Sequence, residues 1–222
     1  MSMSLKLFIF DCDGTIVDSA HTIVEGMEHA YRLHDLPSPG EAATLSIIGL
    51  SLPQAVEQLS PGIAVEARDL LVNSYKDFVI AKREGGDAIE HLYEGAKEVI
   101  EALAAEETYL LGIATGKAYR GVLHLFDSFG WHDHFVTVQT ADRAPSKPNP
   151  GMILQAIAET GVAPEDTVMI GDTSYDIEMA VSAGVRGVGV TWGYHPAVEL
   201  RAAGAHHLVD DYAALDQLLR SL

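Results

Sequence analysis

Short apolar runs alternate with amphipathic stretches along most of the chain, which predicts a parallel sheet covered by helices. The first run, residues 5–10, has the length of a buried strand and stops at Asp11. Further strands are expected at residues 109–114, 135–140, 167–170, 187–191 and 207–209, and helices at 94–105, 119–129, 150–160, 175–183, 196–203 and 212–219. Gly161 and Gly184 stand where helix C-caps belong. The pattern indicates an α/β fold with a doubly wound, Rossmann-like parallel sheet.

Residues 17–85 contain no strand-like run and instead show helical stripes. One stripe is Ile23, Met27, Ala30 and Tyr31; the other is Leu71, Tyr75, Phe78 and Val79. We therefore expect a helical cap domain at 17–85, inserted into a core of residues 1–16 and 86–222. The insertion follows the first strand, so the cap would cover the carboxyl edge of the sheet, where open α/β sheets bind ligands. Hinges are expected near 17–19 and 85–87.

One local feature is expected inside the cap. Ser51 and Gln54 have the spacing of a capping box, in which a serine begins a helix and a glutamine three residues later reaches back to it. This spacing predicts that a helix begins just after Ser51.

The composition fits a globular protein with a packed core: 48% of the 222 residues are hydrophobic. The net charge of −18 argues against binding to nucleic acid or to anionic membranes. The single cysteine excludes an internal disulfide. The apolar stretch before Asp11 is too short for a signal peptide, and no run approaches the roughly 20 residues that span a bilayer. We expect a soluble cytoplasmic protein, a monomer or weak dimer.

Two carboxylates follow the first strand. Asp11 and Asp13 stand two positions apart, and Gly14 permits a sharp turn and the close approach of a ligand. An ordinary strand-ending turn also uses Asp and Gly. A pair of carboxylates directly after a buried strand is nevertheless costly unless a cation or a reaction needs it. Cys12, between them, is interpreted as a buried apolar residue rather than a reactive thiol.

A second acidic pair follows the strand at 167–170. Asp172 lies at the strand end and Asp176 at the start of the next helix. The preference for acids at a helix N-terminus could explain Asp176 alone, but it does not explain Asp172. Carboxylate oxygens are ligands that suit Mg²⁺. In contrast, His206 and His207 are adjacent strand residues that face opposite ways, and both are interpreted as structural.

Two further loops carry groups that could bind phosphate. After the strand at 109–114, the hydroxyl of Thr115 and the amide of Gly116 could hold phosphate oxygens. Before the helix at 150–160, two prolines make the loop around Lys147 rigid. Each of these signals is weak alone, since a loop lysine is most often simply solvated.

The four segments together are much more specific than any one of them. In their order and their places after strands, they resemble the haloacid dehalogenase (HAD) superfamily, in the branch with a small helical cap after the first strand. Phosphoglycolate phosphatases and β-phosphoglucomutases belong to that branch. The resemblance covers the chain from Leu7 to Leu219 and includes all four superfamily motifs.

The resemblance implies a magnesium-dependent phosphatase that hydrolyses a small phosphorylated metabolite through an aspartyl-phosphate intermediate. Asp11 matches the nucleophile and Asp13 the general acid and base. Thr115 matches the phosphate-binding hydroxyl, and Lys147 the lysine that neutralises nucleophile and phosphate. Gly14 and Gly116 would add backbone contacts to the phosphate.

The resemblance also implies the metal ligands. Asp172 and Asp176 match the acidic motif that holds Mg²⁺, with Asp11 and the backbone carbonyl of Asp13 completing the protein ligands. One departure stands out: the family usually has asparagine after the motif hydroxyl, where this chain has Gly116.

The cap loop is expected to face the substrate through Gly49, Leu50 and Ser51. It resembles the β-phosphoglucomutase loop in its glycine but has leucine where that enzyme carries arginine, which disfavours a mutase. Asp13 disfavours a dehalogenase, because a halide leaves without a proton. A catalytically silent HAD-fold binding protein remains an alternative. Residues 191–196 and 200–205 look most like phosphoglycolate phosphatases.

Overall fold

The computed structural model describes residues 5–85 and 91–222. Its sheet has six parallel strands in the order β3-β2-β1-β4-β5-β6. The strands are β1 (Lys6–Phe10), β2 (Tyr109–Thr115), β3 (Phe135–Thr140), β4 (Thr167–Gly171), β5 (Arg186–Val190) and β6 (His207–Val209). The predicted α/β fold is confirmed, and the strand ends differ from those expected by a residue or less.

The alternation of side chains along β1 explains how both faces of the sheet are covered. Phe8 and Phe10 point into one hydrophobic cluster, while Leu7 and Ile9 point into another. All four side chains are fully buried. The first cluster includes residues of α5 (Ala96–Ala104), α6 (Tyr119–Phe129) and α10 (Tyr212–Ser221), and the second those of α7 (Gly151–Thr160) and α8 (Ser174–Ala183). The short α9 (Ala197–Ala202) packs beside β5 and β6.

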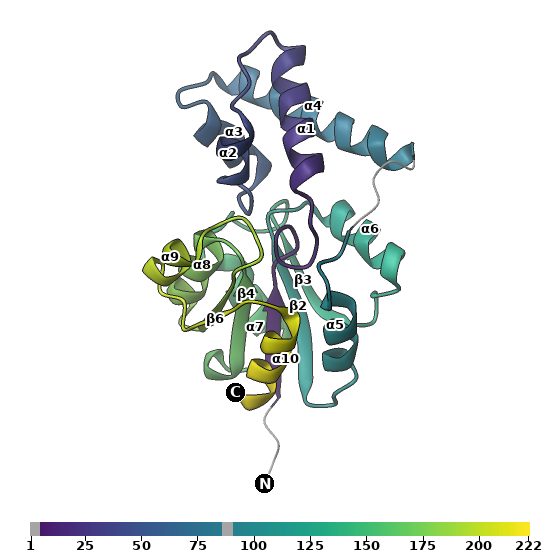
Figure 1. Cartoon of the computed structure of the whole chain (residues 1–222), viewed down its shortest axis with the longest axis vertical. Helices are drawn as coiled ribbons and strands as arrows, with labels where there is room; N and C mark the ends of the chain where they lie inside the picture. The colour runs from purple at the N-terminus through teal and green to yellow at the C-terminus, as the bar shows by residue number, and fades with distance from the viewer. Residues whose placement is uncertain (1–4, 86–90) are drawn as a thin grey trace.

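In the described part of the chain between β1 and α5, four helices stand above the core (Figure 1). They are α1 (Ala20–Leu33), α2 (Glu41–Leu45), α3 (Leu52–Leu59) and α4 (Val65–Glu84). Both helical stripes predicted from the sequence contribute to a separate hydrophobic cluster, through Met27, Ala30 and Tyr31 of α1 and Leu71 of α4. The domain boundaries at 16/17 and 85/86 stay a prediction, and most of the expected hinge at 85–87 lies outside the described residues.

The predicted capping box at Ser51 is wrong in its contacts. Helix α3 begins where expected, with Ser51 as its N-cap, but the Ser51 side chain makes no capping hydrogen bond. The Ser51 backbone N–H, which Gln54 would have to reach, instead donates to Ser146 Oγ of the core at 2.8 Å. A tertiary contact between cap and core has therefore replaced the local one.

The strand order places the chemistry-bearing residues together. The chain runs outward from β1 to β3 on one side and from β4 to β6 on the other, so β1 lies at the reversal of strand order. Asp11 directly follows β1, Thr115 ends β2, and Asp172 directly follows β4. All three therefore stand at the carboxyl edge of adjacent strands. The cap helices lie beyond this edge of the sheet (Figure 1). No helix in the described ranges is both long and apolar enough to cross a bilayer.

Candidate active site

Asp11 is held rigidly at the end of β1. Its backbone N–H donates to the carbonyl of Ile170 in β4 at 2.9 Å, so the residue continues the sheet by one pair. Its Oδ1 accepts a hydrogen bond from the Cys12 N–H at 2.7 Å, and its Oδ2 faces Lys147. The Asp11 side chain is fully buried, as is that of Cys12, which packs with the apolar core as expected.

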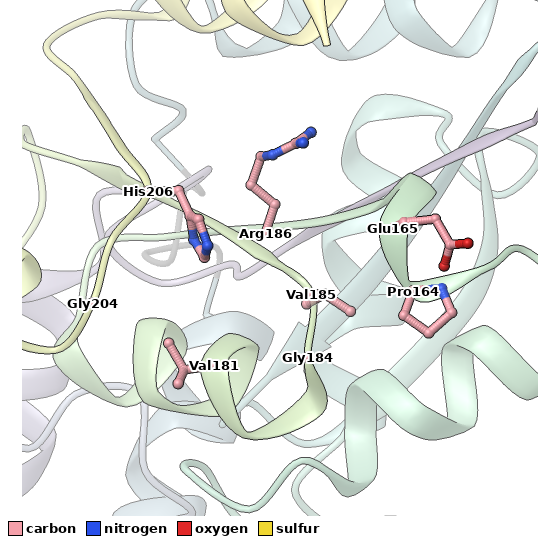
Figure 2. Close-up of a pocket in the computed structure, with 8 residues that line it drawn as sticks. All are labelled: Pro164, Glu165, Val181, Gly184, Val185, Arg186, Gly204 and His206. Carbon is pink, nitrogen blue, oxygen red and sulfur yellow. The ribbon is translucent and has the colours of Figure 1, made fainter.

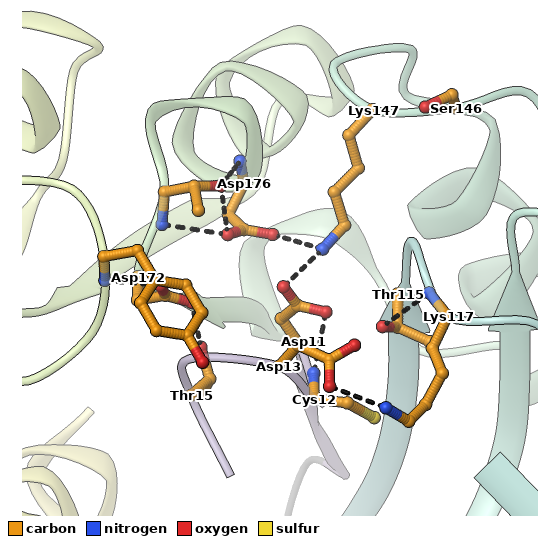
Figure 3. Close-up of polar contacts among 12 residues, drawn as sticks. Asp11, Cys12, Asp13, Thr15, Thr115, Lys117, Ser146, Lys147, Asp172 and Asp176 are labelled. Atoms are coloured by element: carbon orange, nitrogen blue, oxygen red, sulfur yellow. Dashed lines mark hydrogen bonds and ion pairs between the residues drawn. The ribbon is translucent and has the colours of Figure 1, made fainter. Parts of the chain in front are cut away.

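Lys147 reaches into the site from the loop between β3 and α7. Its Nζ lies 2.9 Å from Asp11 Oδ2 and 2.6 Å from Asp176 Oδ1 (Figure 3). The side chain is 1% exposed. A buried ammonium is tolerated only beside compensating charge, and two carboxylates provide it here. The loop lysine is therefore not a solvated surface group.

Asp176 has two distinct oxygen roles. It is the third helical residue of α8, and its Oδ2 accepts hydrogen bonds from the Thr173 N–H at 3.1 Å and the Thr173 hydroxyl at 2.7 Å. The Asp176 N–H donates back to the Thr173 hydroxyl oxygen at 3.4 Å, which completes a capping box. The preference of acids for helix N-termini thus accounts for Oδ2. It does not account for Oδ1, which turns toward Lys147 and Asp11.

Asp172 is fixed by donors on both oxygens. The Thr15 hydroxyl donates to Oδ1 and the Tyr194 N–H donates to Oδ2, each at 2.9 Å. Glycines enclose the carboxylate: a Cβ at Gly14 would lie 2.2 Å from Asp172 Oδ2, and one at Gly193 would lie 2.2 Å from Asp172 Cβ. Gly14 also has φ +86°, which favours glycine. Close approach to Asp172 is therefore a structural reason for glycine at position 14.

The three carboxylates Asp11, Asp172 and Asp176 form one buried cluster. Each offers an oxygen, and these atoms lie within 4.8 Å of one another. Asp11 Oδ2, Asp176 Oδ1 and Lys147 Nζ are buried without a well-oriented hydrogen bond, although the lysine lies within ion-pair distance of both oxygens. One ammonium beside a cluster of three carboxylates leaves the cluster short of positive charge. An oxygen-only donor set with unsatisfied oxygens fits a hard divalent cation.

The pKa values reflect that shortage of positive charge. Burial is the main reason that the pKa of Asp11 rises to about 7; Lys147 opposes the rise and Asp176 adds to it. Burial, then the charges of Asp176 and Asp11, raise the pKa of Asp172 well above its usual range. Burial lowers the pKa of Lys147, but Asp11 and Asp176 outweigh it and the net change is upward. The cluster therefore disfavours three simultaneous negative charges unless a cation joins it.

Asp13 lies outside this cluster and has partners of its own. Lys117 Nζ is 2.6 Å from Asp13 Oδ1, and the Ser19 hydroxyl donates to the same oxygen at 2.7 Å. Burial raises the pKa of Asp13, but Lys117 and then Ser19 outweigh burial and hold it below its usual value. The Ser19 N–H in turn donates to the Tyr194 hydroxyl at 3.1 Å. The carbonyl of Asp13 as a metal ligand stays a prediction.

The sequence did not single out Lys117 or Ser19 as partners of Asp13. Lys117 follows a strand and precedes a helix, which is an ordinary place for a solvated lysine. The signal in the sequence was the position of Lys117 two residues after Thr115. In the structure, Thr115 is 1% exposed at the end of β2, and its Oγ1 accepts the Lys117 N–H at 3.2 Å.

The cap loop at residues 46–51 is docked on three core loops and on helix α8. A Cβ at Gly116 would lie 2.5 Å from the carbonyl oxygen of Leu50, so these two backbones are in contact. Ser51 is bound to Ser146, and the carbonyl of Ser46 accepts hydrogen bonds from the Tyr175 hydroxyl and His195 Nε2, each at 3.2 Å. The loop expected to face the substrate thus lies at the carboxyl edge of the sheet.

A cleft of about 880 Å³ opens between cap and core beside Lys147. Leu50, Gln54 and Gln58 line it from the cap, and Lys147 and Tyr175 from the core. Gln54 and Gln58 were not predicted as site residues, because only the packing of α3 brings them over the lysine loop.

A second hollow of about 470 Å³ contains none of the predicted site residues (Figure 2). It lies at the opposite, amino-terminal edge of the sheet, beside Arg186 at the start of β5. His206 lines it, and its Nδ1 accepts the Gly187 N–H at 3.1 Å, a contact that fits a structural histidine.

Comparison with known families decides the class of this site. The family model described as haloacid dehalogenase-like hydrolase matches residues 8–190. The chain belongs to this hydrolase family. The resemblance seen in the sequence motifs is confirmed, and the Asp11, Asp172 and Asp176 cluster is consistent with the metal site of such a hydrolase.

Relatives match over nearly their full length. The probable phosphatase IndB of Dickeya dadantii is 32% identical over 93% of this chain and 90% of its own. A phosphoglycolate phosphatase of Vibrio vulnificus is 28% identical over 95% of this chain and 94% of its own. Among solved structures, a predicted phosphatase from Clostridium acetobutylicum superposes with a TM-score of 0.87 at 23% identity, covering 99% of this chain and 100% of its own.

Proposed function

We propose that this HAD-family hydrolase is a Mg²⁺-dependent phosphatase that hydrolyses a small phosphorylated metabolite through an aspartyl phosphate, an acyl phosphate formed on Asp11. The observation that carries the proposal is the meeting of Asp11 and Lys147 in one buried site at the end of β1. The names of the relatives support the reaction class, since they are phosphatases.

Each residue has a task that its contacts support. Asp11 attacks phosphorus through Oδ2, the oxygen free of the backbone hydrogen bond, so an Asp11–phosphorus bond forms as the ester P–O bond breaks. Asp13 gives its proton to the leaving oxygen. Water then attacks phosphorus, Asp13 takes the proton of that water, and phosphate and Asp11 separate. Lys147 and the hydroxyl of Thr115 stabilise charge on the transferred oxygens.

Mg²⁺ is the cation that suits the carboxylate cluster best, because it prefers oxygen ligands and retains water. Asp11, Asp172 and Asp176 would hold it, with the carbonyl of Asp13. When bound, it supplies positive charge for the phosphate oxygens. The chain's part is to orient those ligands: Thr15 and Tyr194 fix Asp172, and Thr173 fixes Asp176.

The substrate class is proposed from the relatives and from the cap. Phosphoglycolate phosphatases of 27–28% identity match almost the whole chain, which supports a small phosphorylated acid such as 2-phosphoglycolate. The cap loop is docked tightly on the core, which favours a small substrate over a large one. The mutase alternative requires a second phosphate-binding group in this loop, where the chain has Leu50.

Turnover of p-nitrophenyl phosphate with and without Mg²⁺ tests the proposal. We expect turnover that requires the metal, is abolished by chelation, and is lost in Asp11→Asn. An exposed-site variant with the same change, Asp133→Asn, should behave as wild type. A folded protein that binds phosphate but turns over no ester would indicate the silent binding protein instead. A panel of phosphorylated metabolites, ranked by kcat/KM, then identifies the substrate.

A further inference from the structure

Positive charge also gathers on the Asp13 side of the site, away from Lys147. Lys117 Nζ binds Asp13 Oδ1 at 2.6 Å, and the side chains of both residues are 13% exposed. Ser19 donates to the same oxygen, so both donors address Oδ1. If Asp13 protonates the leaving oxygen, the leaving group must lie on this side. Lys117 is then the core cation nearest to it.

The cap adds a second cation at the same place. Lys117 and Arg83 both lie against Gly121 of α6. A Cβ added at Gly121 would lie 2.8 Å from Lys117 Cγ and 3.5 Å from Arg83 Nη2. Arg83, in the last turn of α4, therefore packs over the same glycine as Lys117. Burial raises the pKa of Asp13, and the charge of Arg83 adds to the larger lowering effects of Lys117 and Ser19 that outweigh burial.

Two other cations of α4 have different surroundings. Lys82 forms an ion pair with Glu25 of α1, and Lys76 is exposed. Tyr75, on the same helix, is influenced by the charges of the Asp13 site. Burial and then Asp13 raise its pKa to about 12, while Lys117 and Arg83 oppose the rise. Arg83 and Tyr75 are thus two residues of α4 that reach the Asp13 side through contacts or charge.

We propose that Arg83 of the cap and Lys117 of the core form a specificity-determining subsite for an alcohol that carries its own negative charge. This rests on the proposed function. Two cations converging in a chain of net charge −18 form a local reversal of the field, and phosphoryl transfer itself does not need them because Lys147 serves the phosphate. The guanidinium of arginine suits a carboxylate especially well.

Three phosphate esters of a two-carbon alcohol test the subsite: 2-phosphoglycolate, ethylene glycol phosphate and phosphoethanolamine. Their leaving groups are anionic, neutral and cationic at nearly constant size. We expect wild type to prefer the anionic ester. Arg83→Gln should lower kcat/KM for 2-phosphoglycolate about 10- to 100-fold, as for loss of one charge-assisted contact, and change the neutral ester less than about threefold.

Matched variants make the result specific. Lys76→Gln removes the same charge from an exposed position of the same helix and should leave all three values unchanged. Arg83→Lys should keep most of the anionic preference. Turnover of all three esters at similar rates, or an equal loss for all three in Arg83→Gln, would overturn the subsite alone. Turnover of none of them, nor of p-nitrophenyl phosphate, would overturn the proposed function and the subsite with it.

Discussion

Gly116 of the core and Leu50 of the cap meet through their backbones: a Cβ atom at position 116 would lie 2.5 Å from the Leu50 carbonyl oxygen and 2.6 Å from that of Gly49. The contact gives a physical reason for glycine where the family usually has asparagine. Even the smallest side chain would have to push the cap loop away, because both opposing atoms belong to the backbone rather than to a flexible side chain.

Gly116→Ala should therefore weaken closure of the cap. We expect kcat/KM to fall about 10-fold for every ester, since displaced cap contacts admit water to the site. Ser146→Ala removes the hydrogen bond to the Ser51 N–H without adding bulk, and its effect should be smaller. Steady-state kinetics and protection of the cap loop from proteolysis provide the measurements. Wild-type kinetics in Gly116→Ala would show that this contact does not matter.

Asp172→Asn should separate stability from activity. The amide can keep both contacts, accepting from the Tyr194 N–H and donating to the Thr15 hydroxyl, while it removes one of three clustered charges. Because burial and like charges raise the pKa of Asp172, the neutral side chain should raise the Tm of the metal-free protein, by about 2–4 °C.

The same variant should lose activity or need far more Mg²⁺. Thermal melts in a chelator and a Mg²⁺ titration of turnover measure the two effects. Asp133→Asn, an equal charge change at an exposed position, is the control and should alter neither. An unchanged Mg²⁺ requirement in Asp172→Asn would remove this residue from the metal site.

Substitutions in the core and in the cap should differ in how they change kcat/KM across a series of esters. Lys147→Gln should depress kcat/KM for all esters by one common factor, on the order of 100-fold or more, because Lys147 meets the phosphoryl group that they share. A Ser51→Ala or Gln54→Ala variant should change the ranking of esters, because these residues stand at the cap loop and the cap side of the cleft. If both cap variants changed kcat/KM for every ester by the same factor, specificity would have to lie elsewhere.

Leu52, the first residue of α3, adjoins Ser51 but is less suited to this test. Its side chain packs against the hydrophobic cluster of the cap, so a Leu52 variant would also report on the packing of the cap itself. Gln54, which lines the cleft beside Lys147, takes its place in the test.

The sheet and its catalytic edge were predictable because buried parallel strands leave a plain mark on a sequence. An apolar run that stops at Asp11, and another that stops before Asp172, fix both the strand and the place of the acid. The family motifs added Thr115 and Lys147, neither of which the local sequence could distinguish from ordinary loop residues.

The contacts between cap and core were not predictable in the same way. The approach of Gly116 to Leu50, and of Arg83 to the glycine beneath Lys117, depends on how two separately packed units meet. The false capping box at Ser51 has the same origin, because its backbone N–H binds Ser146 of the core. Local sequence patterns report local hydrogen bonds, and a tertiary contact can replace them.

Direct trapping of the covalent intermediate tests the central claim. The enzyme, mixed with Mg²⁺ and a substrate ester, is quenched during turnover, treated with borohydride and digested for peptide mass analysis. Borohydride reduces an aspartyl phosphate to homoserine. We predict homoserine at position 11 in wild type and none in Asp11→Asn. Full turnover with Asp11 unmodified, or a phosphorylated residue elsewhere, would contradict the account.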